Sequence, residues 1–256
     1  MISKELLLEV AKRKGLTSRD QMEKDYFQDI FLYRLYGKTN ALVFKGGTAL
    51  YKLYGLRRFS EDLDFSVVRK VEAGEVVGQV AGELGWEVRS EKRMRDAVLV
   101  KLGMRGIVTQ YNTLRIDVSL KNVVFKYDVK GYVPEYVDMP PFSMRVLDLK
   151  EGAAEKIHSL LSRERARDLY DLFFLLRATG VDGRIVDRKL GLFGMKFDLE
   201  EVRRRVAALE ERWGPELKPF LLERVPDFAV VREFVLGRLE RARLGTRGSA
   251  GDGGGR

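Results

Sequence analysis

The sequence contains no cysteine and a single histidine, His158. The absence of cysteine excludes disulfides, thiolate metal sites and cysteine nucleophiles, and one histidine excludes a multi-histidine zinc centre. No apolar run approaches the ~20 residues that a membrane-spanning helix needs. The N-terminal stretch is charged throughout and lacks the uninterrupted apolar core of a signal peptide. We therefore expect a cytoplasmic protein that does not associate with a membrane.

Basic residues outnumber acidic ones across the 256 residues, which gives a formal net charge of +9. This balance favours an anionic partner such as a nucleotide or a nucleic acid. The excess is uneven, because residues 89–130 hold ten Lys or Arg against four Asp or Glu. The hydrophobic share of 45% is enough to bury a core in one large domain or two modest ones.

The periodicity changes along the chain, from mixed in the first half to helical in the second. Helices are predicted first over Ser3–Lys14 and Ser18–Tyr36, the latter opened by a capping box of Ser18 and Gln21. A further helix is expected over Val71–Leu84. Strands are expected over Trp86–Glu91, Ala97–Met104 and Leu114–Leu120. Residues 123–144, rich in Tyr, Gly and Pro, are interpreted as an extended connection.

From residue 147 onward the pattern is helical. The helices are expected over Lys150–Ser162, Ala166–Ala178, Arg184–Leu190, Leu199–Arg212, Pro215–Glu223 and Asp227–Arg243. The Gly-rich segment 245–256 is expected to be disordered. Strands followed by helices are typical of an α+β fold, with domains over 1–146 and 147–244 and a tail over 245–256.

The stretch from Ala41 to Val68 carries the clearest chemical pattern. An apolar run leads into Gly46 and Gly47, which open a short helix, and the backbone N–H groups of such a start can bind a phosphate. A strand with Asp62 and Asp64 follows. Because side chains alternate along a strand, both carboxylates lie on one face, where a hard cation between them would remove their mutual repulsion.

A third carboxylate, Asp117, lies on the polar face of the predicted strand Leu114–Leu120. Three carboxylates with a phosphate loop predict a two-metal site, in which one cation activates an attacking hydroxyl and the other stabilises the leaving pyrophosphate. The ligands are all oxygens, which favours Mg²⁺, with Mn²⁺ as a substitute. The alternative is that Asp117 is a solvated aspartate on an exposed face.

Several motifs resemble the AbiEii/AbiGii toxin family of nucleotidyltransferases, in the DNA polymerase β-like nucleotidyltransferase superfamily. The resemblance is carried by residues 44–50 and 58–64, which hold the Gly-Gly pair and the Asp-x-Asp pair. Residues 23–26 are similar to the N-terminal signature of the family. Glu155–Lys156 and residues 167–172 look like its C-terminal motif. The resemblance therefore spans about residues 23–176.

This resemblance implies a nucleotidyltransferase fold, a small mixed sheet flanked by helices, with a helical C-terminal half that completes the active site. It implies that Asp62 and Asp64 bind metal and that Gly46, Gly47 and Thr48 contact the nucleotide phosphates. Asp117, from the strand pattern, is the third metal ligand, and Ser60 is a further candidate for nucleotide binding. Lys156 would neutralise phosphate charge. Asp168 would be the helical acidic residue, although Asp171 lies three residues away on the same helix face and is the alternative.

Three arginines, Arg163, Arg165 and Arg167, form either a phosphate clamp or a solvated basic turn. Of these, Arg163 and Arg167 are the candidates for nucleotide binding. Lys156 has the alternative of a solvated lysine on an amphipathic helix, and His158 is interpreted as structural. Arg58 and Ser60 either orient the carboxylates or close the turn before the acidic strand.

The family implies transfer of a nucleoside monophosphate from an NTP to an acceptor hydroxyl. The expected acceptor is RNA, specifically tRNA, and the expected setting is the toxin of a type IV toxin–antitoxin system with a cognate antitoxin protein. Two alternatives stay open from the residues alone. One is a metal-dependent glycosyltransferase, which also uses Asp-x-Asp on a strand; the other is a non-catalytic nucleic-acid- or partner-binding protein on the same scaffold.

Overall fold

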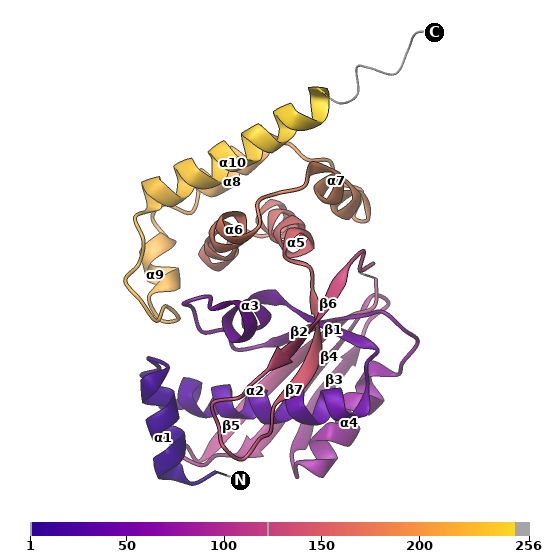
Figure 1. Ribbon diagram of the computed structural model, residues 1–256, viewed down its shortest axis with the longest axis vertical. Helices are drawn as coiled ribbons and strands as arrows, with labels where there is room; N and C mark the ends of the chain where they lie inside the picture. Colours follow the sequence, from indigo (N-terminus) through magenta and orange to yellow (C-terminus); the bar gives the residue numbers. More distant parts are fainter. Residues whose placement is uncertain (1, 122, 249–256) are drawn as a thin grey trace. The chain divides into compact units, whose positions relative to one another are not determined.

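The computed structural model describes residues 2–121 and 123–248. The chain divides into two compact units, Met1–Leu147 and Asp148–Arg256, whose elements are traced in Figure 1. The first unit contains a mixed sheet with helices and the second is helical, which confirms the predicted α+β class. Among the described helices, none has both the length and the apolar character needed to cross a membrane.

The sheet of the first unit has seven strands within the described residues, in the order β3-β4-β5-β2-β1-β7-β6. Their bounds are β1 Leu42–Lys45, β2 Leu63–Val67, β3 Glu87–Arg93, β4 Ala97–Arg105, β5 Tyr111–Ser119, β6 Tyr127–Tyr132 and β7 Phe142–Leu147. The pairs β2–β5 and β1–β7 are parallel and the other neighbours are antiparallel. The sheet is therefore mixed, as predicted.

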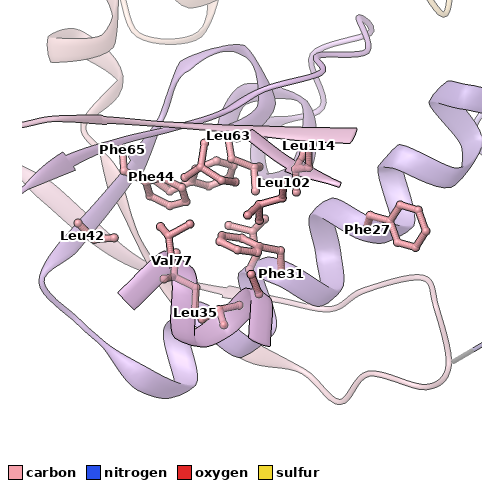
Figure 2. Packing of buried hydrophobic residues seen from close by; sticks show 14 of the residues in the cluster. Phe27, Phe31, Leu35, Leu42, Phe44, Leu63, Phe65, Val77, Leu102 and Leu114 are labelled. Carbon is pink, nitrogen blue, oxygen red and sulfur yellow. The ribbon is translucent and has the colours of Figure 1, made fainter. Parts of the chain in front are cut away.

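Helices α2 (Arg19–Lys38) and α4 (Ala73–Glu83) supply the apolar side chains that pack on one face of the sheet. Figure 2 shows Phe31 and Leu35 of α2 and Val77 of α4 packed near Phe44 and Phe65. All of these side chains are buried, and burying each one contributes about 1.5–3 kcal/mol. This core fixes one face of β2 and β5, and Asp64 and Asp117 lie on the opposite face.

The start of α2 corrects one prediction. Ser18 is the N-cap of α2, but its side chain makes no capping hydrogen bond, so the predicted capping box with Gln21 does not form. The preceding helix, α1 (Lys4–Arg13), does have a side-chain cap, because Ser3 accepts a hydrogen bond from the backbone N–H of Leu6. Helix α2 also runs past Tyr36 to Lys38.

The predicted extended connection over 123–144 was wrong in part, because it contains a strand and the start of another. Strand β6 pairs antiparallel with β7, and β7 pairs parallel with β1 through Phe44 and Val146. Strand β6 lies at the end of the sheet and its side chains are exposed or partly exposed. The alternation from Tyr127 to Lys130 is short and is followed at once by Gly131 and Pro134, which favour a connection over a strand.

The second unit consists of helices in its described part. They are α5 Leu149–Ser162, α6 Ala166–Ala178, α7 Gly183–Gly191, α8 Leu199–Ala207, α9 Trp213–Leu217 and α10 Phe228–Gly248. Aspartate side chains accept hydrogen bonds at the starts of α5, α7 and α8. Helix α8 ends five residues before the predicted Arg212, and α9 begins before the predicted Pro215. Of the disordered tail predicted over 245–256, residues 245–248 belong instead to the end of α10, and residues 249–256 lie outside the described residues.

Candidate active site

The Gly-Gly pair joins β1 to helix α3 (Gly46–Tyr54). Gly46 has a φ of +76°, a left-handed conformation that favours glycine. A Cβ atom at Gly46 would also collide with the carboxylate of Asp64. The absence of a side chain therefore lets the loop lie directly against the acidic strand, with the N-terminus of α3 beside it.

Gly47 is in close contact with two side chains from the turn that precedes the acidic strand. A Cβ atom at Gly47 would collide with the guanidinium of Arg58 and would lie 2.9 Å from the hydroxyl oxygen of Ser60. Arg58 is only 2% exposed, and its Nη1 donates a hydrogen bond to the Phe59 carbonyl at 2.9 Å. A buried positive charge thus lies against the glycine loop, where it would favour an anion.

Two further side chains fix the backbone that leads into the carboxylates. The hydroxyl of Thr48, fully buried, donates a hydrogen bond to the Asp62 carbonyl at 2.5 Å. From α2, Gln28 Nε2 donates to the Ser60 carbonyl at 2.7 Å and to the Glu61 carbonyl at 3.0 Å. The buried Thr48 hydroxyl therefore connects the glycine loop to the acidic strand.

The carboxylates lie on neighbouring parallel strands. Asp64 on β2 is the direct register partner of Asp117 on β5, so their Cα atoms are separated by about one strand spacing, ~4.8 Å. The side chains of Leu63 and Phe65 are fully buried on the opposite face. Asp62 immediately precedes β2. The predicted arrangement, with acidic and apolar residues on opposite faces, is present at Asp64.

Arg115 engages the third carboxylate. Its Nε donates to Asp117 Oδ1 at 2.8 Å and its Nη2 donates to Asp117 Oδ2 at 2.6 Å. This hydrogen bonding, with smaller contributions from the charges of Asp62 and Asp64, raises the pKa of Arg115 above its usual value. Arg115 was not among the residues predicted from the sequence. Its place two residues before Asp117 could have indicated it, because residues two apart on a strand share a face.

The residue types fit a divalent cation. Asp62, Asp64 and Asp117 offer only oxygen donors, which suit Mg²⁺ or Mn²⁺, and two of the three are register partners. As the described side chains are placed, no group of three His, Cys, Asp or Glu residues is arranged to hold a metal ion. Both oxygens of Asp117 are instead engaged by Arg115. A cation at this carboxylate would therefore compete with Arg115.

The second unit brings together the other predicted residues around Lys156. Its Nζ lies 2.9 Å from Asp168 Oδ1 and 2.7 Å from Asp171 Oδ2. Arg163 Nε donates to Asp168 Oδ2 at 2.9 Å. Burial acts to raise the pKa of Asp168, but the charges and hydrogen bonds of Lys156 and Arg163 outweigh it and lower that pKa to about 2. Asp168 is therefore ionised in this cluster at neutral pH.

Two other predicted residues of this unit, Arg167 and His158, contact aromatic rings. The guanidinium of Arg167 lies over the ring of Phe220 at 4.8 Å from its centroid. The ring of His158 stacks on Phe193 with centroids 3.9 Å apart. The stacking agrees with the interpretation of His158 as structural, and the predicted nucleotide contact of Arg167 stays a prediction.

A buried ionic network in the first unit was also missed from the sequence. Lys52 of α3 is fully buried and lies 2.7 Å from both Asp25 Oδ1 and Asp29 Oδ1. Lys14 Nζ lies 2.5 Å from Asp25 Oδ2, and Tyr136 donates to the same oxygen at 2.7 Å. Burial acts to raise the pKa of Asp25, but the two lysines hold it below its usual range. The network ties α3 to α2.

Solved structures of other proteins share the fold of this chain. MenT4, a nucleotidyltransferase toxin from Mycobacterium tuberculosis, has a TM-score of 0.66 and 24% identity, covering 93% of this chain and 89% of that chain. JHP933 from Helicobacter pylori has a TM-score of 0.55 and 19% identity, covering 91% of this chain and 96% of that chain. The fold is thus that of nucleotidyltransferases. No curated protein sequence matches the chain.

The family model described as nucleotidyl transferase AbiEii toxin, type IV TA system, matches residues 30–233. The chain belongs to this family and is a nucleotidyltransferase. The match extends well beyond Leu176, where the resemblance of individual motifs ends, and so includes most of the helical unit. This assignment favours the predicted reaction class over a glycosyltransferase or a non-catalytic binding protein.

Proposed function

We propose that this nucleotidyltransferase transfers a nucleoside monophosphate from an NTP to a hydroxyl of an RNA acceptor, specifically a tRNA. The observation that carries the proposal is the register pairing of Asp64 with Asp117 directly beside the Gly46 loop. Carboxylates next to a helix N-terminus place oxygen ligands for a cation and N–H donors for phosphates in one site. Few other reactions need both.

The glycine loop and its supports would bind the triphosphate. The backbone N–H groups at Gly47 and Thr48, at the start of α3, are aimed by the loop conformation, and the charge of Arg58 lies against Gly47. Ser60, next to Gly47, offers a hydroxyl at the same place. Together these groups favour the polyanionic donor and fix the α-phosphate for attack.

The carboxylates of Asp62, Asp64 and Asp117 would hold Mg²⁺, or Mn²⁺ in its place. When bound, this cation supplies positive charge that lowers the pKa of the acceptor hydroxyl and offsets charge on the pyrophosphate. Arg115 orients the Asp117 carboxylate through two hydrogen bonds. The chain itself thus contributes three carboxylates beside the Gly46 loop, where the reacting phosphate would bind.

In the helical unit we assign Lys156 to neutralise phosphate charge. Asp168 and Asp171 hold its ammonium from two sides and so restrict its position. Arg163, half-exposed and paired to Asp168, and Arg167 offer further cations to the nucleotide. The protein would act as the toxin of a type IV system, in the cytoplasm, with its activity opposed by a cognate antitoxin.

The test is incorporation of each of the four α-³²P-labelled NTPs into total RNA in the presence of Mg²⁺. Asp62→Ala and Asp64→Ala are expected to reduce incorporation by at least about a thousandfold while the thermal unfolding midpoint stays near that of the wild type. Asp96→Ala is the matched control, because Asp96 is half-exposed and its ion pair within the described part of the chain is with the exposed Lys121, at 3.6 Å. Full activity in both site variants would overturn the proposal.

A further inference from the structure

One face of the strands β3, β4 and β5 carries exposed basic side chains outside the nucleotide site. We call it the open-face basic surface and define it by Arg89, Lys92, Lys101, Arg105 and Tyr111. Each of these residues is exposed, and Tyr111 is 42% exposed although it is aromatic. All of them lie in the first unit.

The alternation of each strand places these residues on the face opposite the core. On β5, Leu114, Ile116 and Val118 are buried, and the residues between them face away. On β4 the residues Val98, Val100 and Leu102 are likewise buried. The antiparallel register pairs Arg115 with Lys101, and Lys101 with Ser90, so one polar face extends across all three strands.

An aromatic platform lies on this face. The Tyr111 ring crosses strand β4 at Gly103, where a Cβ atom would collide with the tyrosine. The Arg89 guanidinium lies 4.8 Å from the centroid of the Tyr111 ring. Gly103 thus leaves room for a stacked pair of Tyr111 and Arg89, and such pairs are surfaces on which nucleobases stack.

The open-face basic surface is continuous with the carboxylates. In one row across the sheet, Asp64 pairs with Asp117, Asp117 with Leu99 and Leu99 with Lys92. Three strand spacings separate the ends of this row, a distance of about 14 Å. A chain that has its terminal hydroxyl at Asp64 could therefore extend over β4 to β3 without leaving the face.

Three cations of this surface can bind an anionic ligand without first losing an ion pair. Lys92, Lys101 and Arg105 form no ion pair with any residue that the structure describes. The acidic exception is Glu87, which pairs with Arg89 at 3.1 Å. Clustered lysines and arginines without internal partners attract a polyanion, whose phosphates can take the unused hydrogen-bond donors.

We propose that the open-face basic surface holds the single-stranded 3′ end of the RNA acceptor. This inference rests on the proposed function and names where its second substrate lies. Lys92, Lys101 and Arg105 contact phosphates, and an unpaired base stacks on Tyr111. Single-stranded RNA fits because its bases are free to stack on an aromatic ring, whereas those of a duplex are paired and stacked on each other.

The first test measures binding directly, by fluorescence anisotropy of a fluorescein-labelled single-stranded RNA oligonucleotide with the full-length protein. Lys101→Glu/Arg105→Glu is expected to weaken binding at least about tenfold and to reduce the salt slope by about two phosphate contacts. Tyr111→Ala is expected to weaken binding about fivefold or more with little change in that slope. Lys12→Glu/Lys4→Glu, on exposed positions of α1, makes the same charge change elsewhere and is expected to bind as wild type.

A second variant separates the platform from the charge. Gly103→Ala keeps every basic side chain but displaces the Tyr111 ring and crowds Arg89, whose Cγ would lie 3.0 Å from the added Cβ, so it is expected to resemble Tyr111→Ala. Wild-type affinity in the Lys101/Arg105 variant, or equal loss in the α1 control, would overturn the proposal. Tighter binding of a blunt duplex than of the single strand would also overturn it.

Binding of the NTP donor, measured separately, distinguishes a failure of this inference from a failure of the proposed function. Calorimetric titration of NTP with Mg²⁺ is expected to give the same dissociation constant for the Lys101/Arg105 variant and the wild type. If the wild type incorporates no nucleotide but its RNA binding still depends on Lys101 and Arg105, the proposed function fails and the surface stands. If incorporation occurs and the variant keeps the wild-type KM for RNA, the surface fails and the function stands.

Discussion

Arg115 donates two hydrogen bonds to Asp117, the carboxylate that pairs in register with Asp64. The guanidinium therefore lies among the same negative charges that a divalent cation would need. A residue at this position has two effects with opposite signs. It fixes the orientation of the Asp117 carboxylate, and it competes with a cation for that same carboxylate.

Arg115→Ala is expected to tighten Mn²⁺ binding by about three- to tenfold. Without the guanidinium, Asp117 is released and the three carboxylates repel each other, and a cation relieves that repulsion. The estimate is modest because the Arg115 side chain is 52% exposed and solvent screens its charge. Calorimetric titration of Mn²⁺ measures the change. Arg105→Ala removes the same charge from the same face and is expected to leave Mn²⁺ affinity unchanged; weaker binding in Arg115→Ala would contradict the competition.

Gly46→Ala and Gly55→Ala form a matched pair for the glycine loop. Both glycines have a φ of +76°, but a Cβ at Gly46 collides with Asp64, whereas a Cβ at Gly55 meets nothing within 4 Å. The left-handed conformation alone costs about 1–2 kcal/mol in each case. Gly55→Ala is expected to lose only that stability and keep its activity. Gly46→Ala is expected also to displace Asp64 and lose at least about a hundredfold in incorporation.

Urea unfolding and the labelled-NTP assay together measure both effects. Equal activity in the two alanine variants would show that the contact between Gly46 and Asp64 has no part in catalysis.

Lys52→Met is expected to lower the free energy of unfolding by about 3–5 kcal/mol. It leaves Asp25 and Asp29 buried with one charge partner fewer, and removing one partner of a buried ion pair costs about this much. Chemical denaturation measures the loss. Lys4→Met, at an exposed position, is the control for losing a lysine. In the double variant Lys52→Met/Asp29→Asn the loss is expected to be smaller than the sum of the two single losses, because both remove the same interaction.

The pKa of Asp168, about 2, predicts how acid affects stability. In the unfolded chain an aspartate has a pKa near 3.9, so folding lowers the pKa of this group. Its contribution is therefore present above about pH 4 and is lost as the pH falls toward 2, and it amounts to about 2 kcal/mol. The urea midpoint followed from pH 6 downward measures it. Asp168→Asn is expected to be less stable at pH 6 and to show a shallower loss in acid; an unchanged slope would contradict the assignment.

Local patterns in the sequence were enough to predict the central part of the fold and site. The alternation in Leu114–Leu120 predicted a strand with Asp117 on its polar face, and β5 has that form. The pairing of Asp64 with Asp117 was not predictable from spacing, because register depends on which distant strands become neighbours. Strand β6 was missed because its alternation spans only four residues and glycine and proline follow it, while its side chains add nothing to the core.

The burial of polar and charged residues on α2 was also not predictable from the helical periodicity of the sequence. On α2, the residues Glu23, Asp25, Gln28 and Asp29 are fully buried. A helix-period reading assigns such residues to the solvent face. Their partners lie far along the chain, as Lys52 does for Asp25 and as the backbone N–H groups of Val108 and Ile107 do for Glu23. Only the folded contacts reveal why these charges are tolerated.

The buried network sets a limit on how short an active fragment can be. The family match begins at residue 30, which would suggest a truncation point at the middle of α2. Such a fragment would lack Asp25 and Asp29 and would leave the ammonium of Lys52, fully buried on the helix that starts at the glycine loop, without either carboxylate. Expression of the catalytic unit on its own therefore has to begin upstream of Asp25, and inclusion of Lys14 completes the charge balance.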